Sequence, residues 1–246
     1  MTFDITSTYT NYTYNISMYV PEMDAPEKGF PVIYVLDGSA YFEFVKEIVR
    51  LQSQNVVRTR ITPSIVVGVG HGEDMRVRRF YDFTAPAENY YYPEKFRGNS
   101  DRQHGGAAKF SCFLEEELKP AIQENYLINT NEQTLFGHSL AGYFALWQLF
   151  NAPASFNKYA AISPSIWWNN HELQQYAKVY LKNHNKIESS LFIGVGELEE
   201  SMVDDAQDMA QQLSAAMDTS FYITPDENHS SVVPTILSRA LRFVNK

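Results

Sequence analysis

One serine in this sequence has the neighbours that an activated nucleophile requires. Ser139 lies between Gly137 and Ala141, so the segment matches the G-x-S-x-G pattern with alanine in place of the second glycine. A serine between a strand and a helix must occupy a sharp turn to expose its oxygen, and small residues on either side let the strand and helix pack around that turn. A serine that merely caps a helix is the alternative. Because an apolar strand precedes it and a long helix follows, we predict Ser139 as a nucleophile, with Gly142 easing the packing beside Ala141.

A serine hydroxyl is a poor nucleophile until a base removes its proton. In folds with this strand–serine–helix turn, the histidine comes last in chain order. His229 fits because it follows the last predicted strand and precedes the last predicted helix. The side chain of His138 is expected to point away from Ser139 at a tight turn. Of the six histidines, we predict His229 as the general base.

The acid that would orient the base is expected after the predicted strand at 191–195. Three glutamates lie close together there, Glu197, Glu199 and Glu200. Such a group is also typical of a solvated helix start, where negative charge is favourable. We favour Glu199 with Glu197 as second choice, since spacing from the strand does not separate them.

A tetrahedral intermediate needs backbone N–H donors for its oxyanion. One is expected from Leu140, directly after the nucleophile, and the other from Ser39, after the predicted strand at 31–36. Asp37 is then interpreted as a turn-former. Trp167 and Trp168 follow another strand end, where they form either core or the wall of a substrate pocket.

The elements that would position these residues alternate regularly in the second half of the chain. Strands are predicted at 134–136, 158–162, 191–195 and 220–224, and helices at 140–150, 172–181, 204–217 and 232–244. Earlier, the pattern predicts strands at 3–9, 14–20, 31–36 and 64–70, and helices at 41–57 and 106–126, with Pro120 kinking the latter or lying near its end. Alternation of this kind predicts an α/β fold with a mostly parallel sheet, helices on both faces and an antiparallel N-terminal hairpin. Ligands then lie at the carboxyl ends of the strands.

Residues 71–106 show no periodicity, and so long a loop in one domain is usually functional. We predict a single domain over residues 1–246, with 71–106 as a cap-like insertion over the site. The net charge of −9 argues against nucleic-acid or anionic-membrane partners, and no stretch approaches the roughly 20 apolar residues of a membrane span. The single Cys112 and the absence of a visible secretory signal favour the cytoplasm. No phosphate loop, dinucleotide fingerprint or zinc pattern is present, so no cofactor and no metal are expected.

The order of these motifs resembles the esterase D-like group of α/β-hydrolases. Within that group, the chain is most similar to the esterases of trilactone catecholate siderophores, of the enterobactin, bacillibactin and salmochelin type. The resemblance implies Ser139 as nucleophile, His229 as base and Glu199, in a Gly-x-x-Glu position, as acid. The group usually has glycine where this chain has Ala141, which bears on the fine positioning of the turn. The segments that support the resemblance are 35–38, 81–84, 105–107 with Phe110 and Phe113, 137–142, 163–168, 196–199 and His229.

The resemblance implies a small-molecule ester substrate, with an iron–siderophore as one candidate. An iron–tris-catecholate is bulky and anionic, so it needs arginines and aromatic surface near the serine. Residue Arg79 is the first candidate for such a contact, and a solvated loop whose arginines pair with its six acids is the alternative. The other candidates in the same loop are Arg76, Arg78, Arg97, Arg102, Tyr90, Tyr91 and Tyr92.

Two classes of function are therefore compared. The first is a serine esterase that works through an acyl-enzyme, acting on a siderophore trilactone or, alternatively, as a general carboxylesterase or a carbohydrate, feruloyl or thioester hydrolase. The second is an inactive binding module on a hydrolase scaffold, to which Ala141 and the ambiguous acid lend some weight. A serine that reacts with a fluorophosphonate probe would exclude the second class.

Overall fold

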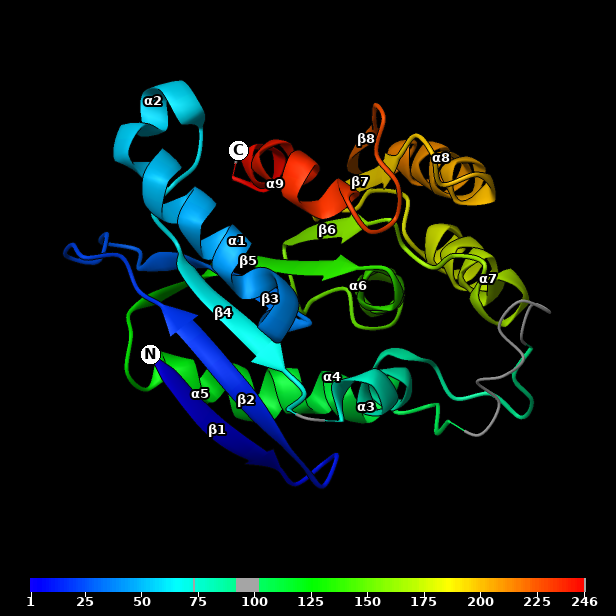
Figure 1. Ribbon diagram of the computed structural model, residues 1–246, viewed down its shortest axis with the longest axis horizontal. Helices are drawn as coiled ribbons and strands as arrows, with labels where there is room; N and C mark the ends of the chain where they lie inside the picture. The colour runs from blue at the N-terminus through cyan, green and yellow to red at the C-terminus, as the bar shows by residue number, and fades with distance from the viewer. Residues whose placement is uncertain (73, 92–101, 246) are drawn as a thin grey trace.

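A single eight-stranded sheet runs through the computed structural model of the chain, which describes residues 1–72, 74–91 and 102–245. The strand order is β1-β2-β4-β3-β5-β6-β7-β8, and only β1 and β2 run antiparallel to their neighbours. This is the α/β-hydrolase fold that the sequence predicts (Figure 1). The strands are β1 (Thr2–Ser7), β2 (Tyr12–Tyr19), β3 (Phe30–Leu36), β4 (Ile65–Gly70), β5 (Ile128–His138), β6 (Lys158–Ile162), β7 (Ser190–Gly196) and β8 (Asp218–Thr224).

Apolar side chains on both faces of the central strands hold the helices in place. On β3, Val32 and Tyr34 belong to one core, while Ile33 and Val35 belong to the core on the opposite face. Strands covered on both sides have this continuous apolar sequence, whereas β1 shows the alternation of a strand with one solvated face. The apolar runs and the alternating runs therefore identify the centre and one edge of the sheet.

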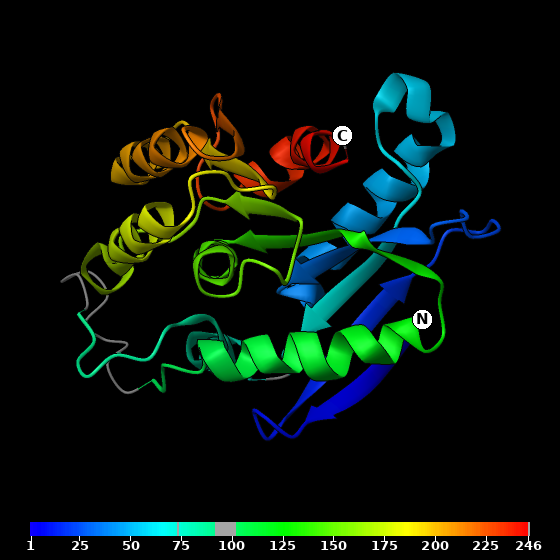
Figure 2. The same ribbon diagram turned by 180° about the vertical axis from the view of Figure 1, so that it is seen from behind.

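Helices cover both faces of this sheet (Figures 1 and 2). Helices α1 and α9 pack on one face, and α4 to α8 pack on the other. The helices of the described residues are α1 (Gly38–Gln52), α2 (Val56–Thr59), α3 (Met75–Phe83), α4 (Ala107–Cys112), α5 (Lys119–Gln123), α6 (Leu140–Asn151), α7 (Trp168–Asn183), α8 (Ser201–Ser214) and α9 (Val232–Val244). None of them is long and apolar enough to cross a membrane.

The structure corrects the prediction of an unbroken loop over residues 71–106. Helix α3 forms there, because its Arg78 and Asp82 pair at i,i+4 spacing with an N–O distance of 2.9 Å. The buried face of this helix combines the fully buried Asp82 side chain with the Phe83 ring in the core, so charged and apolar residues are mixed on it. A helix anchored by buried polar groups is missed by hydrophobic periodicity.

Several predicted boundaries differ from the structure by a few residues, and two of these differences have a clear physical cause. Strand β5 begins at Ile128, six residues before the predicted start, because its polar first half pairs with β3 only through a register shift. The helix predicted at 106–126 is helical from Ala107 to Gln123, but a π-helical stretch at Phe113–Leu118 interrupts it just before Pro120. A proline removes one helical N–H and crowds the carbonyl four residues earlier, and the wider turn accommodates both effects.

Candidate active site

The turn that holds Ser139 has the strained backbone of an exposed nucleophile. It follows β5 directly and precedes α6, with φ 60° and ψ −120° at Ser139. A Cβ atom at Gly137 would lie 2.2 Å from the Ala141 carbonyl oxygen, and one at Gly142 would lie 3.0 Å from the Pro164 Cα. The two close approaches are therefore at Gly137 and Gly142. The methyl group of Ala141 fits in the core, which explains why this position does not need glycine.

Three side chains from three strand ends meet at this turn. The Nε2 atom of His229 lies 3.0 Å from the Ser139 Oγ, and its Nδ1 atom lies 2.6 Å from Glu199 Oε2. Ser139 follows β5, Glu199 follows β7 and His229 follows β8, so the parallel strands deliver all three to one edge of the sheet. The Glu199 carboxylate accepts a hydrogen bond from Nδ1–H, which leaves Nε2 free to accept the serine proton. This arrangement can convert the hydroxyl into a nucleophile.

The structure shows which of Glu197 and Glu199 contacts His229, a choice that the sequence left open. The side chain of Glu199 is 1% exposed, and its Oε1 accepts hydrogen bonds from the Ser163 hydroxyl at 2.5 Å and the Gly196 N–H at 2.7 Å. Burial alone would raise the pKa of Glu199, but hydrogen bonds from His229, Ser163 and Gly196 outweigh it and hold the pKa below its usual value. Glu197 instead accepts the Asp226 N–H at 3.0 Å. Of these two glutamates, only Glu199 contacts His229.

Ser163 is a site residue to which sequence reasoning gave no role. It is fully buried at the end of β6 and has a positive φ of 43°. Its hydroxyl can reach Glu199 because Ser163 N–H bonds to the Gly194 carbonyl at 2.6 Å, which fixes the loop against β7. The position after a central strand was the available signal, since ligands and site residues gather at strand ends.

A second histidine packs against the base. The ring centroids of His138 and His229 are 4.6 Å apart, and Tyr41 Oη lies 2.9 Å from His138 Nδ1. Burial, followed by the charge that His229 can bear, lowers the pKa of His138 to about 3. Its ring is therefore neutral at ordinary pH and adds no charge beside the base.

Replacing His138 with glutamine should make the fold less sensitive to acid. Between pH 6.5 and about 3, the unfolded chain binds a proton at residue 138 that the folded chain excludes, so the free energy of unfolding falls as the pH falls. Glutamine does not titrate, and the variant should lose roughly 2 kcal/mol less than the wild type between about pH 7 and about pH 4.5. Urea unfolding at the two pH values measures this difference. The control is His171→Gln, at an exposed site; equal losses in wild type and His138→Gln would contradict the expectation.

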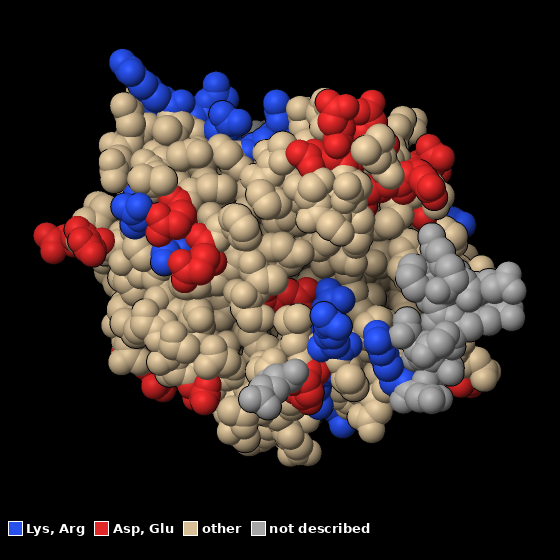
Figure 3. Space-filling model, in the orientation of Figure 1, with Lys and Arg blue, Asp and Glu red and all other residues tan. Residues whose placement is uncertain are grey.

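A cleft of about 360 Å³ opens beside Ser139. Three arginines line it, Arg76, Arg79 and Arg102, together with the ring of Phe80. Figure 3 shows basic side chains gathered at the border of a hollow on this face, although the chain has a net charge of −9. Arg102 lies over the Phe80 ring, with its guanidinium carbon 4.3 Å from the ring centroid. The cleft therefore combines positive charge with aromatic surface.

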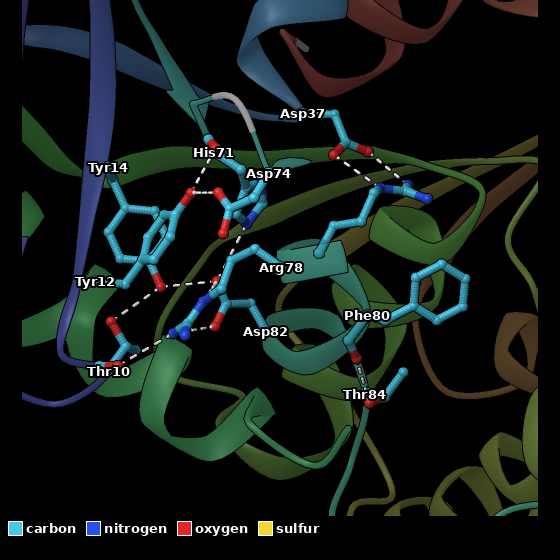
Figure 4. A network of polar contacts seen from close by, with 11 residues as sticks. Thr10, Tyr12, Tyr14, Asp37, His71, Asp74, Arg78, Phe80, Asp82 and Thr84 are labelled. Atoms are coloured by element: carbon cyan, nitrogen blue, oxygen red, sulfur yellow. Dashed lines mark hydrogen bonds and ion pairs between the residues drawn. The ribbon is translucent and has the colours of Figure 1, made fainter. Parts of the chain in front are cut away.

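Arg79 is held in the cleft by Asp37. Its Nε and a terminal nitrogen lie 3.1 and 2.7 Å from the two carboxylate oxygens, a bidentate pair (Figure 4). Asp37 has left-handed backbone angles, φ 50° and ψ 47°, directly before α1, so it does form the turn that the sequence predicts. The expected oxyanion donors, Ser39 and Leu140, lie in the first turns of α1 and α6, where backbone N–H groups have no acceptor within the helix.

A buried polar network fixes helix α3 to the N-terminal hairpin (Figure 4). The Tyr14 hydroxyl donates to Asp82 at 2.8 Å, and Arg78 Nε donates to the same carboxylate oxygen at 3.0 Å. His71 Nε2 lies 3.2 Å from that oxygen, and the Tyr12 hydroxyl contacts Asp74. The opposite face of α3 lines the cleft. The network therefore sets the position of the cleft arginines on α3.

The two tryptophans have different environments. Trp168 has no exposed surface and lies in the core, which is the first of the two alternatives that the sequence left open and not the pocket wall. Its ring stacks on His104, with centroids 5.3 Å apart, and His104 in turn contacts Phe80, which lines the cleft. Trp167 is half-buried against the same core. Neither is among the described residues that line the cleft.

Several candidates cannot be placed in this geometry. Tyr92 and Arg97 lie outside the described residues. Arg78 pairs with Asp82, one of the six acids of the predicted loop, so that part of the predicted pairing is present. Arg79 pairs instead with Asp37, which lies outside residues 71–106. Across residues 1–72, 74–91 and 102–245, no group of three acidic, histidine or cysteine side chains is arranged to hold a metal ion.

Comparison with known proteins identifies similar sequences and folds. Residues 7–232 match the model of the family described as "Putative esterase". The chain is 36% identical to the ferri-bacillibactin esterase BesA of Bacillus subtilis, over 95% of this chain and 85% of that protein. It is 29% identical to the siderophore enterobactin esterase of Emericella nidulans, over 90% and 84% of the two chains. The crystal structure of the BES protein from Bacillus cereus matches 99% of this chain and 95% of that one, with a TM-score of 0.90 and 40% identity.

Proposed function

This chain belongs to the esterase family and is a serine esterase, and from that premise we propose that Ser139, His229 and Glu199 form its catalytic triad. The observation that supports the assignment is the unbroken line of contacts from Glu199 through His229 to the Ser139 Oγ, at 2.6 and 3.0 Å. The same three residues are the ones that the order of motifs selects. We further propose that the substrate is an anionic trilactone siderophore.

Acylation begins when the Ser139 Oγ attacks the ester carbonyl. His229 Nε2 accepts the serine proton and then delivers it to the leaving alcohol oxygen. Glu199 remains ionised and stabilises the imidazolium that forms between these two transfers. The products of this stage are the free alcohol and an acyl-enzyme at Ser139.

Deacylation repeats the sequence with water as nucleophile. His229 takes a proton from the water, the hydroxide adds to the acyl carbonyl, and the tetrahedral intermediate expels the Ser139 oxygen. The proton on His229 returns to that oxygen. The enzyme is regenerated and the carboxylic acid is released.

The negative charge on the tetrahedral intermediate needs fixed donors. The backbone N–H groups of Ser39 and Leu140 fill this role in the proposal, because both lie in the first turns of helices, where amides have no acceptor within the helix. Arg79 places a guanidinium in the same cleft, held by Asp37 so that little reorganisation accompanies charge formation. Asp37 balances the charge of Arg79, so the role proposed for this guanidinium beside Ser139 is that of a fixed hydrogen-bond donor.

The chemistry of the cleft supports a catecholate trilactone over a neutral ester. Among the described residues, Arg76 and Arg102 form no ion pair, so their charges are available to a ligand. Phe80 offers a flat ring beside them. The relatives named for ferri-bacillibactin and enterobactin hydrolysis are consistent with this substrate class. The charge of the described cleft is thus opposite to that of the chain as a whole.

Neutralising the two unpaired arginines should weaken trilactone hydrolysis selectively. We expect Arg76→Gln combined with Arg102→Gln to raise the KM for an iron-loaded enterobactin-type trilactone about tenfold, because each exposed charge contact contributes about 0.2 to 1 kcal/mol. Hydrolysis of an uncharged aryl acetate should stay within about twofold. Steady-state kinetics on both substrates measures the effect, and added salt should reduce the wild-type preference.

The control for this experiment is Arg58→Gln, an exposed arginine on α2. Equal losses on both substrates would show that the arginines act on the turn and do not recognise the substrate. A wild-type kcat/KM higher for the aryl acetate than for the trilactone would contradict the siderophore proposal and favour a general carboxylesterase. Rapid labelling of Ser139 by a fluorophosphonate probe is expected, and its absence would favour an inactive binding module.

The compartment is the remaining part of the proposal. We place the enzyme in the cytoplasm because its single cysteine, Cys112, cannot form a disulfide within the chain. Proteins of reducing compartments commonly keep their thiols free. Fractionation of cells that express the tagged protein tests this location.

A further inference from the structure

The nucleophile has a second hydroxyl neighbour besides His229. Ser165 Oγ lies 3.4 Å from the Ser139 Oγ. The backbone fixes this neighbour, because the Ser165 N–H donates to the Ser139 carbonyl oxygen at 3.0 Å. The residue is 2% exposed, so bulk water does not compete freely for its hydroxyl. Ser165 is therefore held beside the reacting oxygen by the same turn that exposes it.

The proton positions in the triad decide which serine donates. The Nδ1–H of His229 donates its hydrogen bond to Glu199, so Nε2 must accept the hydrogen bond from the Ser139 hydroxyl. A hydroxyl has a single proton to donate, and that of Ser139 is then committed to His229. In the contact between the two serines, Ser139 is consequently the acceptor and Ser165 the donor. Among the described residues, the Ser165 hydroxyl has the Ser139 Oγ as its hydrogen-bond partner.

We propose that Ser165 is a further catalytic residue, which donates a hydrogen bond to the Ser139 Oγ and acts mainly in deacylation. This inference rests on the triad proposed above, since it assumes that Ser139 becomes acylated. The inference assigns a role to a hydroxyl that has no part in the triad mechanism of Ser139, His229 and Glu199.

The selectivity for deacylation follows from how well the Ser139 oxygen accepts in each state. In the free enzyme, Oγ belongs to an alcohol, which is a good acceptor, so the bond from Ser165 exists before acylation and changes little during attack. Interactions of equal strength in ground and transition states do not accelerate a step. In the acyl-enzyme, Oγ is an ester oxygen whose lone pair is delocalised into the carbonyl, and it accepts weakly.

The bond is regained as deacylation proceeds. Addition of hydroxide to the carbonyl localises the lone pair on Oγ, and collapse of the intermediate breaks the carbon–Oγ bond and leaves its electron pair on Oγ. The Ser165 hydroxyl stabilises this developing negative charge, while the proton that completes the serine comes from His229. Ser165 keeps its own proton throughout. Ser165 thus assists departure of the serine oxygen by a hydrogen bond alone and transfers no proton.

Rapid-mixing kinetics with an activated aryl acetate separates the two steps. The fast release of aryl alcohol gives the acylation rate constant, and the later steady phase gives the deacylation rate constant. We expect Ser165→Ala to slow deacylation about tenfold while acylation stays within about twofold, which is the loss of one hydrogen bond to a partly charged oxygen. Intact acyl-enzyme should accumulate and be visible by mass spectrometry after acid quench.

Two further variants separate the hydrogen bond from loss of volume. Ser165→Cys nearly preserves the side-chain size but donates weakly, so it should slow the same step. Ser64→Ala removes another fully buried hydroxyl, which donates to the Thr62 carbonyl at 2.8 Å far from the triad, and should leave both rate constants unchanged. Normal deacylation in Ser165→Cys, or equal slowing of acylation and deacylation in Ser165→Ala, would overturn the proposal.

Failure of the triad itself would look different. If Ser139 is not the nucleophile, a fluorophosphonate will not label it in the wild-type protein, and no acyl-enzyme will form at that residue in any variant. If Ser139 is labelled and acylated but Ser165→Ala deacylates at the wild-type rate, the triad holds and the role given to Ser165 is wrong.

Discussion

Replacing Ser139 with alanine is expected to lower kcat/KM for any ester by about ten-thousandfold or more, the loss typical of removing a triad nucleophile. The variant loses one oxygen at the mouth of a cleft and leaves the buried core intact, so its unfolding temperature should stay close to that of the wild type. Initial rates on an aryl acetate and on a trilactone measure the loss. Residual activity reflects the oxyanion donors and substrate binding alone.

A catalytically intact Ser139→Ala protein would exclude the esterase mechanism built on this residue. The matched control is Ser163→Ala in the neighbouring loop, which removes a hydroxyl that contacts Glu199 and not the reacting oxygen. It should lose activity far less severely, because the carboxylate keeps its bonds from Gly196 and His229.

Replacing Glu199 with glutamine is expected to lower kcat by about a thousandfold to ten-thousandfold, the range seen when the acid of a triad becomes an amide. An amide can present its NH₂ group to His229 Nδ1, which favours the tautomer with the proton on Nε2. That tautomer cannot accept the serine proton. The loss should fall in kcat more than in KM, because substrate binding does not involve this buried side chain.

The matched control is Glu197→Gln, which changes the same chemical group two residues earlier. Its carboxylate contacts the Asp226 N–H and not the base, so activity should stay within about twofold of the wild type. A large loss in Glu197→Gln with little loss in Glu199→Gln would reverse the assignment of the acid. Similar small losses in both would indicate that a serine–histidine pair suffices.

The sequence predicted the parts of this fold that depend on apolar runs and on chain order. The strand before Ser139 and the helix after it are short-range features, and the α/β-hydrolase order places the base last. The same reasoning selected His229, which the structure places 3.0 Å from the serine oxygen. It could not separate Glu197 from Glu199, because a loop of four residues can aim either side chain inward.

What the sequence could not predict depends on pairing between distant residues. Helix α3 was missed because its buried face is held by Asp82 and Tyr14, which are 68 positions apart in the chain. Arg79 was a candidate for contact with substrate, but the sequence could not show that Asp37, directly before α1, pairs with it and fixes its orientation. For Ser163 the sequence offered only its position after a central strand, because a hydroxyl shows its acceptor only when the fold is known.

Helix α3 presents two faces with separate tasks, and this has a consequence for how specificity can evolve. Arg78 and Asp82 attach it to the hairpin, while Met75, Arg76 and Phe80 look onto the cleft. Substitutions on the face of α3 that lines the cleft can therefore alter which ester is accepted. They leave the attachment of α3 to the hairpin and the turn at Ser139 undisturbed. A lineage built on this scaffold could acquire new substrates through a few positions of one short helix, with its chemistry inherited unchanged.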